Sequence, residues 1–136
     1  MDEQWIKWEP IQGLSRHYYV DLIIDSFDGF FVVLTDAENE NKKIEIKFLD
    51  SVKAYRSTDE VYRIHLVSTL RETHGEEFIN EWALFKVKNS DYKKWLTKQS
   101  YDFFDSDTTT HFSIIGGESI VDIIANYDPI VEFKEK

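Results

Sequence analysis

The sequence contains no cysteine, and this absence excludes several chemistries at once. Without thiols there are no disulfide bonds, no thiolate zinc site, no cysteine-ligated iron–sulfur cluster and no cysteine nucleophile. A secretory signal is missing as well, because the chain opens with the acidic residues Asp2 and Glu3 rather than with a basic and then an apolar segment. We therefore expect a protein of the reducing cytoplasm.

Long apolar runs and prolines are equally scarce. The longest apolar runs, residues 30–34 and 120–125, have the length of strands, whereas a membrane span needs about 20 residues. The two prolines, Pro10 and Pro129, lie near the ends of the chain, and no repeat or linker divides its 136 residues. These features predict a single domain over residues 1–136 that has no contact with membranes.

Positive charge is also in short supply. Sixteen Lys and Arg oppose 26 Asp and Glu, which gives a formal net charge of −10. Such a chain repels phosphate backbones, so we expect it not to bind nucleic acid. The negative charge either serves solubility alone or steers the protein toward a basic protein partner, such as a nuclease.

Most segments in the first half of the chain are typical of β-strands. The clearest example places Ile44, Ile46 and Phe48 on one side and charged residues on the other, a period of two that predicts a half-buried strand. The Asp28-Gly29 pair predicts a hairpin turn. The pattern as a whole predicts an antiparallel meander with strands at residues 17–25, 30–35 and 42–48 and a polar loop at residues 36–41.

Ser57 and Glu60 have the spacing of a capping box, which predicts a helix over residues 59–74 that ends at Gly75. An alternation of apolar residues in the same segment leaves a strand as the other possibility. We expect a further helix to begin at Asn89 or Ser90. Short strands are predicted at residues 52–56, 82–87, 111–115, 120–127 and 130–133.

The resulting fold class is α+β. We expect mainly antiparallel sheet, made of the meander plus a C-terminal hairpin that turns at residues 116–118, with about two helices packed on one face.

No sequence motif indicates catalysis or a cofactor. The four histidines show no metal-pair spacing, Gly116-Gly117 lacks the lysine of a phosphate loop, and there is no serine elbow. His111 is the histidine of most interest, because Asp105 and Asp107 precede it closely. We expect no catalytic, metal or cofactor site, and therefore not an enzyme.

Two aromatic pairs offer the best candidates for binding. Trp5 and Trp8 either cover one edge of the sheet or form an exposed anchor. Phe103 and Phe104 are neighbours in an acidic segment, and neighbouring residues of an extended chain point to opposite sides. One of these two rings is therefore expected to project from an acidic rim toward a partner.

Several segments together resemble small acidic uncharacterised proteins of Bacillus-like bacteria. Some members of that group are encoded beside polymorphic or contact-dependent toxins and are regarded as immunity proteins. The resemblance implies a cytoplasmic antitoxin that occludes a basic toxin domain, such as a nuclease, and it supplies no functional residues. The segments that carry it are residues 28–30, 52–60, 85–92, 111–115 and 121–124.

Three functional hypotheses follow. The first is a protein-binding module of the immunity or antitoxin kind. The second is a small-molecule-binding protein or an enzyme that uses His111, Arg56 and Tyr55, and the third is a self-associating structural module. For the first hypothesis the expected contact residues are Asp36, Glu38, Glu40, Asp102, Phe103, Phe104, Asp105 and Asp107.

Overall fold

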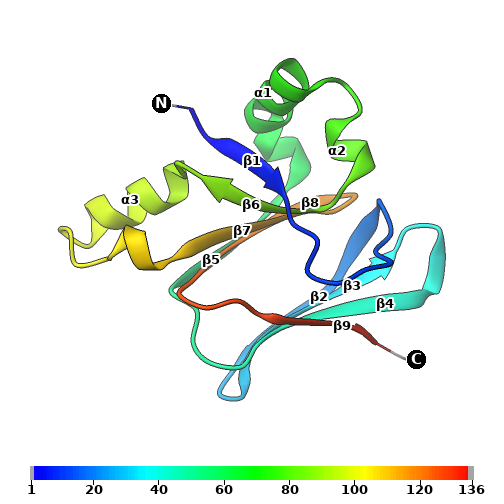
Figure 1. The fold of residues 1–136 in the computed structure, drawn as a ribbon, viewed down its shortest axis with the longest axis horizontal. Coiled ribbons are helices and arrows are strands. Elements are labelled where there is room, and N and C mark those ends of the chain that lie inside the picture. The colour runs from blue at the N-terminus through cyan, green and yellow to red at the C-terminus, as the bar shows by residue number, and fades with distance from the viewer. Residues whose placement is uncertain (1, 135–136) are drawn as a thin grey trace.

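Two antiparallel sheets pack face to face in the computed structural model, which describes residues 2–134 (Figure 1). In spatial order, the five-stranded sheet consists of β1 (Gln4–Lys7), β6 (Leu84–Lys88), β7 (Thr110–Ile115), β8 (Ser119–Ala125) and β5 (Ala54–Asp59). The four-stranded sheet consists of β2 (Tyr18–Ser26), β3 (Gly29–Asp36), β4 (Asn39–Phe48) and β9 (Ile130–Lys134).

The four-stranded sheet forms as its sequence pattern predicts. The apolar side chains of β4, Ile44, Ile46 and Phe48, are all buried against the other sheet. The turn between β2 and β3 depends on Gly29, which has a φ of +133° and would place a Cβ 2.4 Å from the carbonyl oxygen of Phe48. Only glycine fits at that position.

The central strands of the five-stranded sheet are buried on both faces. Ile114 and Ile123 face the four-stranded sheet, whereas Ile115 and Ile120 face the opposite side. This double burial explains why β7 and β8 are almost continuous apolar runs rather than alternating ones.

Helices α1 (Ile64–His74) and α2 (Phe78–Glu81) lie on the side of the five-stranded sheet that faces away from the four-stranded sheet, whereas α3 (Asp91–Gln99) follows β6 beyond the end of the sheet (Figure 1). Val67 and Leu70 of α1 and Ile79 of α2 pack there with Phe85. No helix within residues 2–134 covers the outer face of the four-stranded sheet, and none is long and apolar enough to cross a membrane. The helical elements are η1 (Glu60–Arg63), α1 (Ile64–His74), α2 (Phe78–Glu81), α3 (Asp91–Gln99) and η2 (Ser106–Thr108).

The structure confirms the α+β class and corrects the expected details. There are two sheets instead of one, and β1 and α2 were not predicted. The predicted loop at residues 36–41 is wrong, because β3 and β4 stay paired up to Asp36 and Asn39 and leave only a tight turn.

The predicted helix over residues 59–74 exists, but it begins differently. Ser57 does not cap it, because this residue pairs with Val121 inside β5. Asp59 instead accepts a hydrogen bond from the amide of Val61 and starts the 3₁₀ turn η1, which leads into α1. The helix ends before Gly75, as predicted, and Gly75 has a φ of +100°.

Candidate functional site

A buried polar network on the helix-covered face of the five-stranded sheet is the most ordered arrangement of chemically active side chains. Its centre is Asp122 of β8, which is wholly buried. Nε2 of His111, on β7, lies 2.7 Å from Oδ1 of Asp122. Nε of Arg56 and Nη1 of Arg63 donate hydrogen bonds of 2.8 and 3.0 Å to Oδ2. We call these four residues, together with Ser90, the Asp122 network.

Strand pairing brings the members of this network together. Asp122 lies directly opposite Arg56 of β5, and His111 lies diagonally across from it on β7, two residues before its direct partner Ser113. Burial alone would raise the pKa of Asp122, but the hydrogen bond from His111 and the charge of Arg56 outweigh burial and hold this pKa well below its usual range. The lowered pKa favours the anionic form of Asp122, whose hydrogen bonds join β5, β7, β8 and the turn η1.

Ser90 adds a serine to the histidine and the aspartate of the network, and these three residue types also form the catalytic triad of many hydrolases. Its Oγ lies 2.7 Å from Nδ1 of His111, so that serine, histidine and aspartate form a chain. In a catalytic triad the serine contacts Nε2 and the aspartate contacts Nδ1, and here the two nitrogens are exchanged. Oγ also accepts a 3.0 Å hydrogen bond from the amide of Lys93 and so caps α3.

Burial decides what this chain of side chains can do. Ser90 is 3% exposed, His111 1% and Asp122 0%, so a substrate carbonyl cannot approach Oγ to the roughly 3–3.5 Å that an attack requires. The hydroxyl is already engaged as a helix cap. The hydrogen bonds of the Asp122 network therefore position α3 and β5.

The second hypothesis required His111, Arg56 and Tyr55 to share a site, and the structure separates them. His111 and Arg56 meet at Asp122, but Tyr55 points to the other face of β5, where its ring lies 4.5 Å from that of Phe30. Arg56 also contacts the ring of Tyr92, at 4.1 Å from its centroid. Tyr92 therefore links the buried network to the surface on the far side of α3.

That surface contains a groove of about 670 Å³. We call it the aromatic groove, because Phe27, Tyr55 and Trp95 line it and are exposed together with Leu49. It lies between the β2–β3 turn, the β4–β5 connection and α3.

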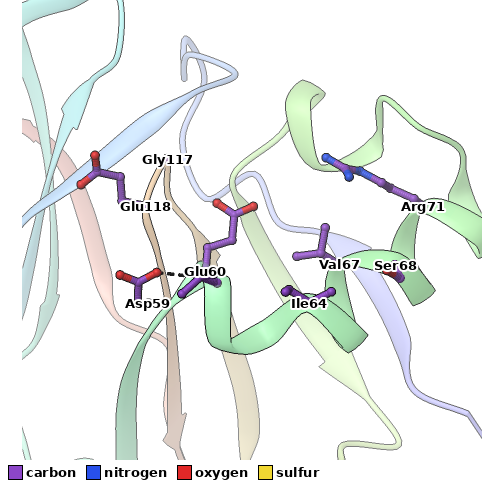
Figure 2. A pocket seen from close by; sticks show the side chains of 9 residues that line it. Asp59, Glu60, Ile64, Val67, Ser68, Arg71, Gly117 and Glu118 are labelled. Carbon is purple, nitrogen blue, oxygen red and sulfur yellow. Dashed lines mark hydrogen bonds between the residues drawn. The ribbon is translucent and has the colours of Figure 1, made fainter.

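A second hollow, of about 640 Å³, lies between η1, α1 and the β7–β8 turn. Figure 2 shows the carboxylates of Asp59 and Glu118 at one side of this acidic pocket and Arg71 at the other. Glu60 and Ser68 also line the pocket, and its apolar wall includes Ile64 and Val67. Among residues 2–134 no group of three or more histidine, aspartate or glutamate side chains is arranged to hold a metal ion.

The segment after α3 presents two aromatic rings almost completely to solvent. Tyr101 is 95% exposed and Phe103 is 92% exposed. Tyr101 and Asp102 have φ values of +50° and +68°, a left-handed conformation that costs roughly 1–2 kcal/mol per residue. The backbone is held there because the amide of Asp102 donates to Thr97 and the amide of Phe103 donates to Ser100. We call residues 101–107 the aromatic loop.

The expected contact residues fall into two groups. One ring of the pair projects and the other does not, as the sequence predicted: Phe103 is exposed and Phe104 is half-buried, and the nearby residues Asp102, Asp105 and Asp107 are exposed. The other group, Asp36, Glu38 and Glu40, lies on the β3–β4 turn, in another part of the fold. Asp36 is buried and bonded to the hydroxyl of Ser15 and the amide of Glu38, so it is not available to a partner.

The two tryptophans near the N-terminus are structural. Trp5 and Trp8 are both buried, one beneath the helices and the other between the sheets, so the alternative of an exposed anchor is wrong. Sequence reasoning did not identify Asp122 or Arg63, and it treated Ser90 as a helix cap alone.

Comparison with known proteins gives no relative for this arrangement: no protein-family model, curated protein or solved structure matches the chain.

Proposed function

We propose that this protein is a non-catalytic binding module that inhibits a basic protein, in the manner of an immunity protein or antitoxin directed at a nuclease-like toxin domain. The observation that carries the proposal is the aromatic loop. Tyr101 and Phe103 stand almost fully in solvent on a backbone that is strained and yet fixed by hydrogen bonds. Strained, well-supported segments cluster at functional sites.

The chemistry of the loop fits a basic partner. Tyrosine and phenylalanine are enriched at protein interfaces, and tyrosine is a frequent hot spot. The exposed residues Asp102, Asp105 and Asp107 lie in the same loop as the two rings, and the whole chain carries a net charge of −10. Complementary charge accelerates the encounter with a basic protein and favours it over acidic competitors.

The proposal needs no reacting group, in agreement with the burial of Ser90 and His111. Self-association through the same loop is disfavoured, because two copies would bring Asp102, Asp105 and Asp107 of each chain close to those of the other.

Affinity capture from cells of the source organism tests the proposal. The bait is the wild-type chain, and the comparison is the double variant Tyr101→Ser/Phe103→Ser. The control, Tyr62→Ser, removes another exposed ring, from η1. We expect the wild type and the control to retain a basic protein that the double variant loses.

Two follow-up measurements decide the outcome. Titration calorimetry with the captured protein is expected to show binding that weakens as salt rises. Co-expression is expected to relieve any toxicity of that protein. Equal capture by the double variant, or a captured protein that is acidic, would contradict the proposal.

A further inference from the structure

Large apolar side chains that usually avoid water gather around the aromatic groove. Phe27 stands completely free at the tip of the β2–β3 turn, and Leu49, Tyr55 and Trp95 are each about half exposed. The base of the groove is Phe30, which is buried. Exposed apolar patches of this kind on a small protein mark interaction sites.

The walls of the groove are fixed before anything binds. Tyr55 packs on Phe30 with ring centroids 4.5 Å apart. Trp95 packs near Tyr92 at 5.9 Å, and the guanidinium of Arg56 holds the ring of Tyr92 from the side of the Asp122 network. A groove with preformed walls loses little conformational entropy on binding.

The charge at the groove identifies the chemistry of its occupant. Asp25 and Asp50 are exposed carboxylates of the lining, whereas Lys53 is the single cation among the lining residues. Aromatic faces next to carboxylates are the surroundings that a guanidinium prefers, because it stacks on the rings and pairs with the acids. The protein itself already places Arg56 on Tyr92 in this way.

We propose that the aromatic groove receives an arginine-bearing segment of the basic partner. The guanidinium stacks on Trp95 or Tyr55 and pairs with Asp25 or Asp50, while an apolar neighbour in the segment covers Phe27 and Leu49. This inference rests on the proposed function and adds a second contact region to it.

The groove and the aromatic loop are close enough for one partner to cover both. Trp95 lies five residues before Ser100, the C-cap of α3, which corresponds to about 7.5 Å along the helix axis. An interface of ordinary size covers roughly 800 Å² on each protein, enough to include both regions.

A peptide experiment tests the groove without the partner. The probe is a capped peptide with the core Arg-Leu-Arg, and the control peptide has the core Gln-Leu-Gln. Amide and indole NMR signals of the ¹⁵N-labelled protein are followed during titration. We expect saturable shifts of the Trp95 indole and of the amides near Phe27 and Tyr55 with the arginine peptide only. Equal shifts with both peptides, or shifts confined to the acidic pocket, would overturn the inference.

Variants separate the groove from general surface charge. Trp95→Leu keeps an apolar side chain but removes the ring, and we expect it to weaken binding of the arginine peptide at least tenfold, as Asp25→Asn and Asp50→Asn do in combination. Tyr62→Leu removes an exposed ring outside the groove and is expected to bind as the wild type does. Thermal melting checks that each variant is folded. Unchanged binding by folded Trp95→Leu would contradict the inference.

The same variants show which proposal fails. If Trp95→Leu captures the basic partner with wild-type affinity while the loop variant does not, the groove inference is wrong and the proposed function stands. If no basic partner is captured but the arginine peptide occupies the groove, the groove inference stands as an arginine site and the proposed function is wrong.

Discussion

The two sheets differ in the solvent exposure of their ion pairs. On the helix-covered face of the five-stranded sheet, Asp122 is wholly buried and receives hydrogen bonds from two arginines and His111. On the bare outer face of the four-stranded sheet, Lys43 pairs with Asp21 at 2.6 Å, and both are partly exposed. Water can replace either partner in the exposed pair, whereas water has no access to Asp122, which depends on its protein partners even though the side chain of Arg56 is 41% exposed.

This difference separates the part of the molecule that determines the fold from the surface that we propose as the binding region. The Asp122 network fixes β5, β8, η1 and the start of α3 relative to one another. The aromatic loop and the aromatic groove lie beyond it, at the surface around α3, where side chains can change with little effect on stability.

Replacement of the buried carboxylate has the largest expected effect. Asp122→Asn leaves Arg56 and Arg63 without their anion, and breaking a buried pair in this way typically costs about 3–5 kcal/mol. Urea unfolding measures the change. Asp21→Asn on the exposed face is the matched control, for which we expect a loss of less than about 1 kcal/mol. Similar losses for the two variants would contradict the comparison.

The pH dependence of stability tests the same carboxylate in the wild type. The pKa of Asp122 is lower in the folded protein than its ordinary value of 3.8, so the unfolded chain takes up a proton more readily. Its contribution to stability is therefore complete above about pH 5 and is lost progressively as the pH falls through and below the unfolded value. Between pH 6 and pH 3 the free energy of unfolding should decrease more steeply with falling pH for the wild type than for Asp122→Asn. Parallel curves would show that Asp122 does not contribute in this way.

Removal of the helix cap has a smaller effect. Ser90→Ala deletes the acceptor for the Lys93 amide and the partner of His111. Loss of a cap costs about 1 kcal/mol, and an unpaired buried ring nitrogen costs about 1–3 kcal/mol, so we expect a total of about 2–4 kcal/mol. Ser68→Ala, at an exposed position of α1, serves as the control and should remain near the wild-type value.

The exposed pair is expected to contribute least. A double-mutant cycle with Lys43→Ala and Asp21→Ala should give a coupling free energy of about 0.2–1 kcal/mol that decreases with salt. Urea unfolding at low and at high ionic strength provides the measurement. A coupling above about 2 kcal/mol would place this pair in the same class as Asp122.

Local signals in the sequence predicted most helices and strands. The arrangement of the strands into two sheets could not be predicted, because it depends on pairing between distant segments. The turn at Gly29 predicts the pairing of β2 with β3, and the alternation around Ile44 predicts the strand β4 that pairs with β3. These pairings are local, because the paired strands follow one another in the sequence. The second sheet depends on the pairing of β1 with β6 and of β5 with β8, which joins segments far apart in the chain. No local pattern encodes those contacts, so a single sheet was expected.

The candidate site shows the same limit. The sequence predicted that one of Phe103 and Phe104 projects, because neighbours in an extended segment point to opposite sides, but it did not identify Phe103 as the exposed one. Asp122 could have been found from its position between Val121 and Ile123, since a lone carboxylate inside an apolar run must be buried and therefore paired. Its partners could not be named in the same way, because Arg56 and Arg63 approach it only through the pairing of β5 and the turn η1.

The most direct test measures stability and binding on the same variant. Tyr101→Ser/Phe103→Ser is expected to unfold within about 0.5 kcal/mol of the wild type, because both rings lie in solvent. Its affinity for the captured basic protein should fall at least a hundredfold by titration calorimetry, which corresponds to about 2.8 kcal/mol. Wild-type affinity in the folded double variant would contradict the claim that the aromatic loop is the binding surface.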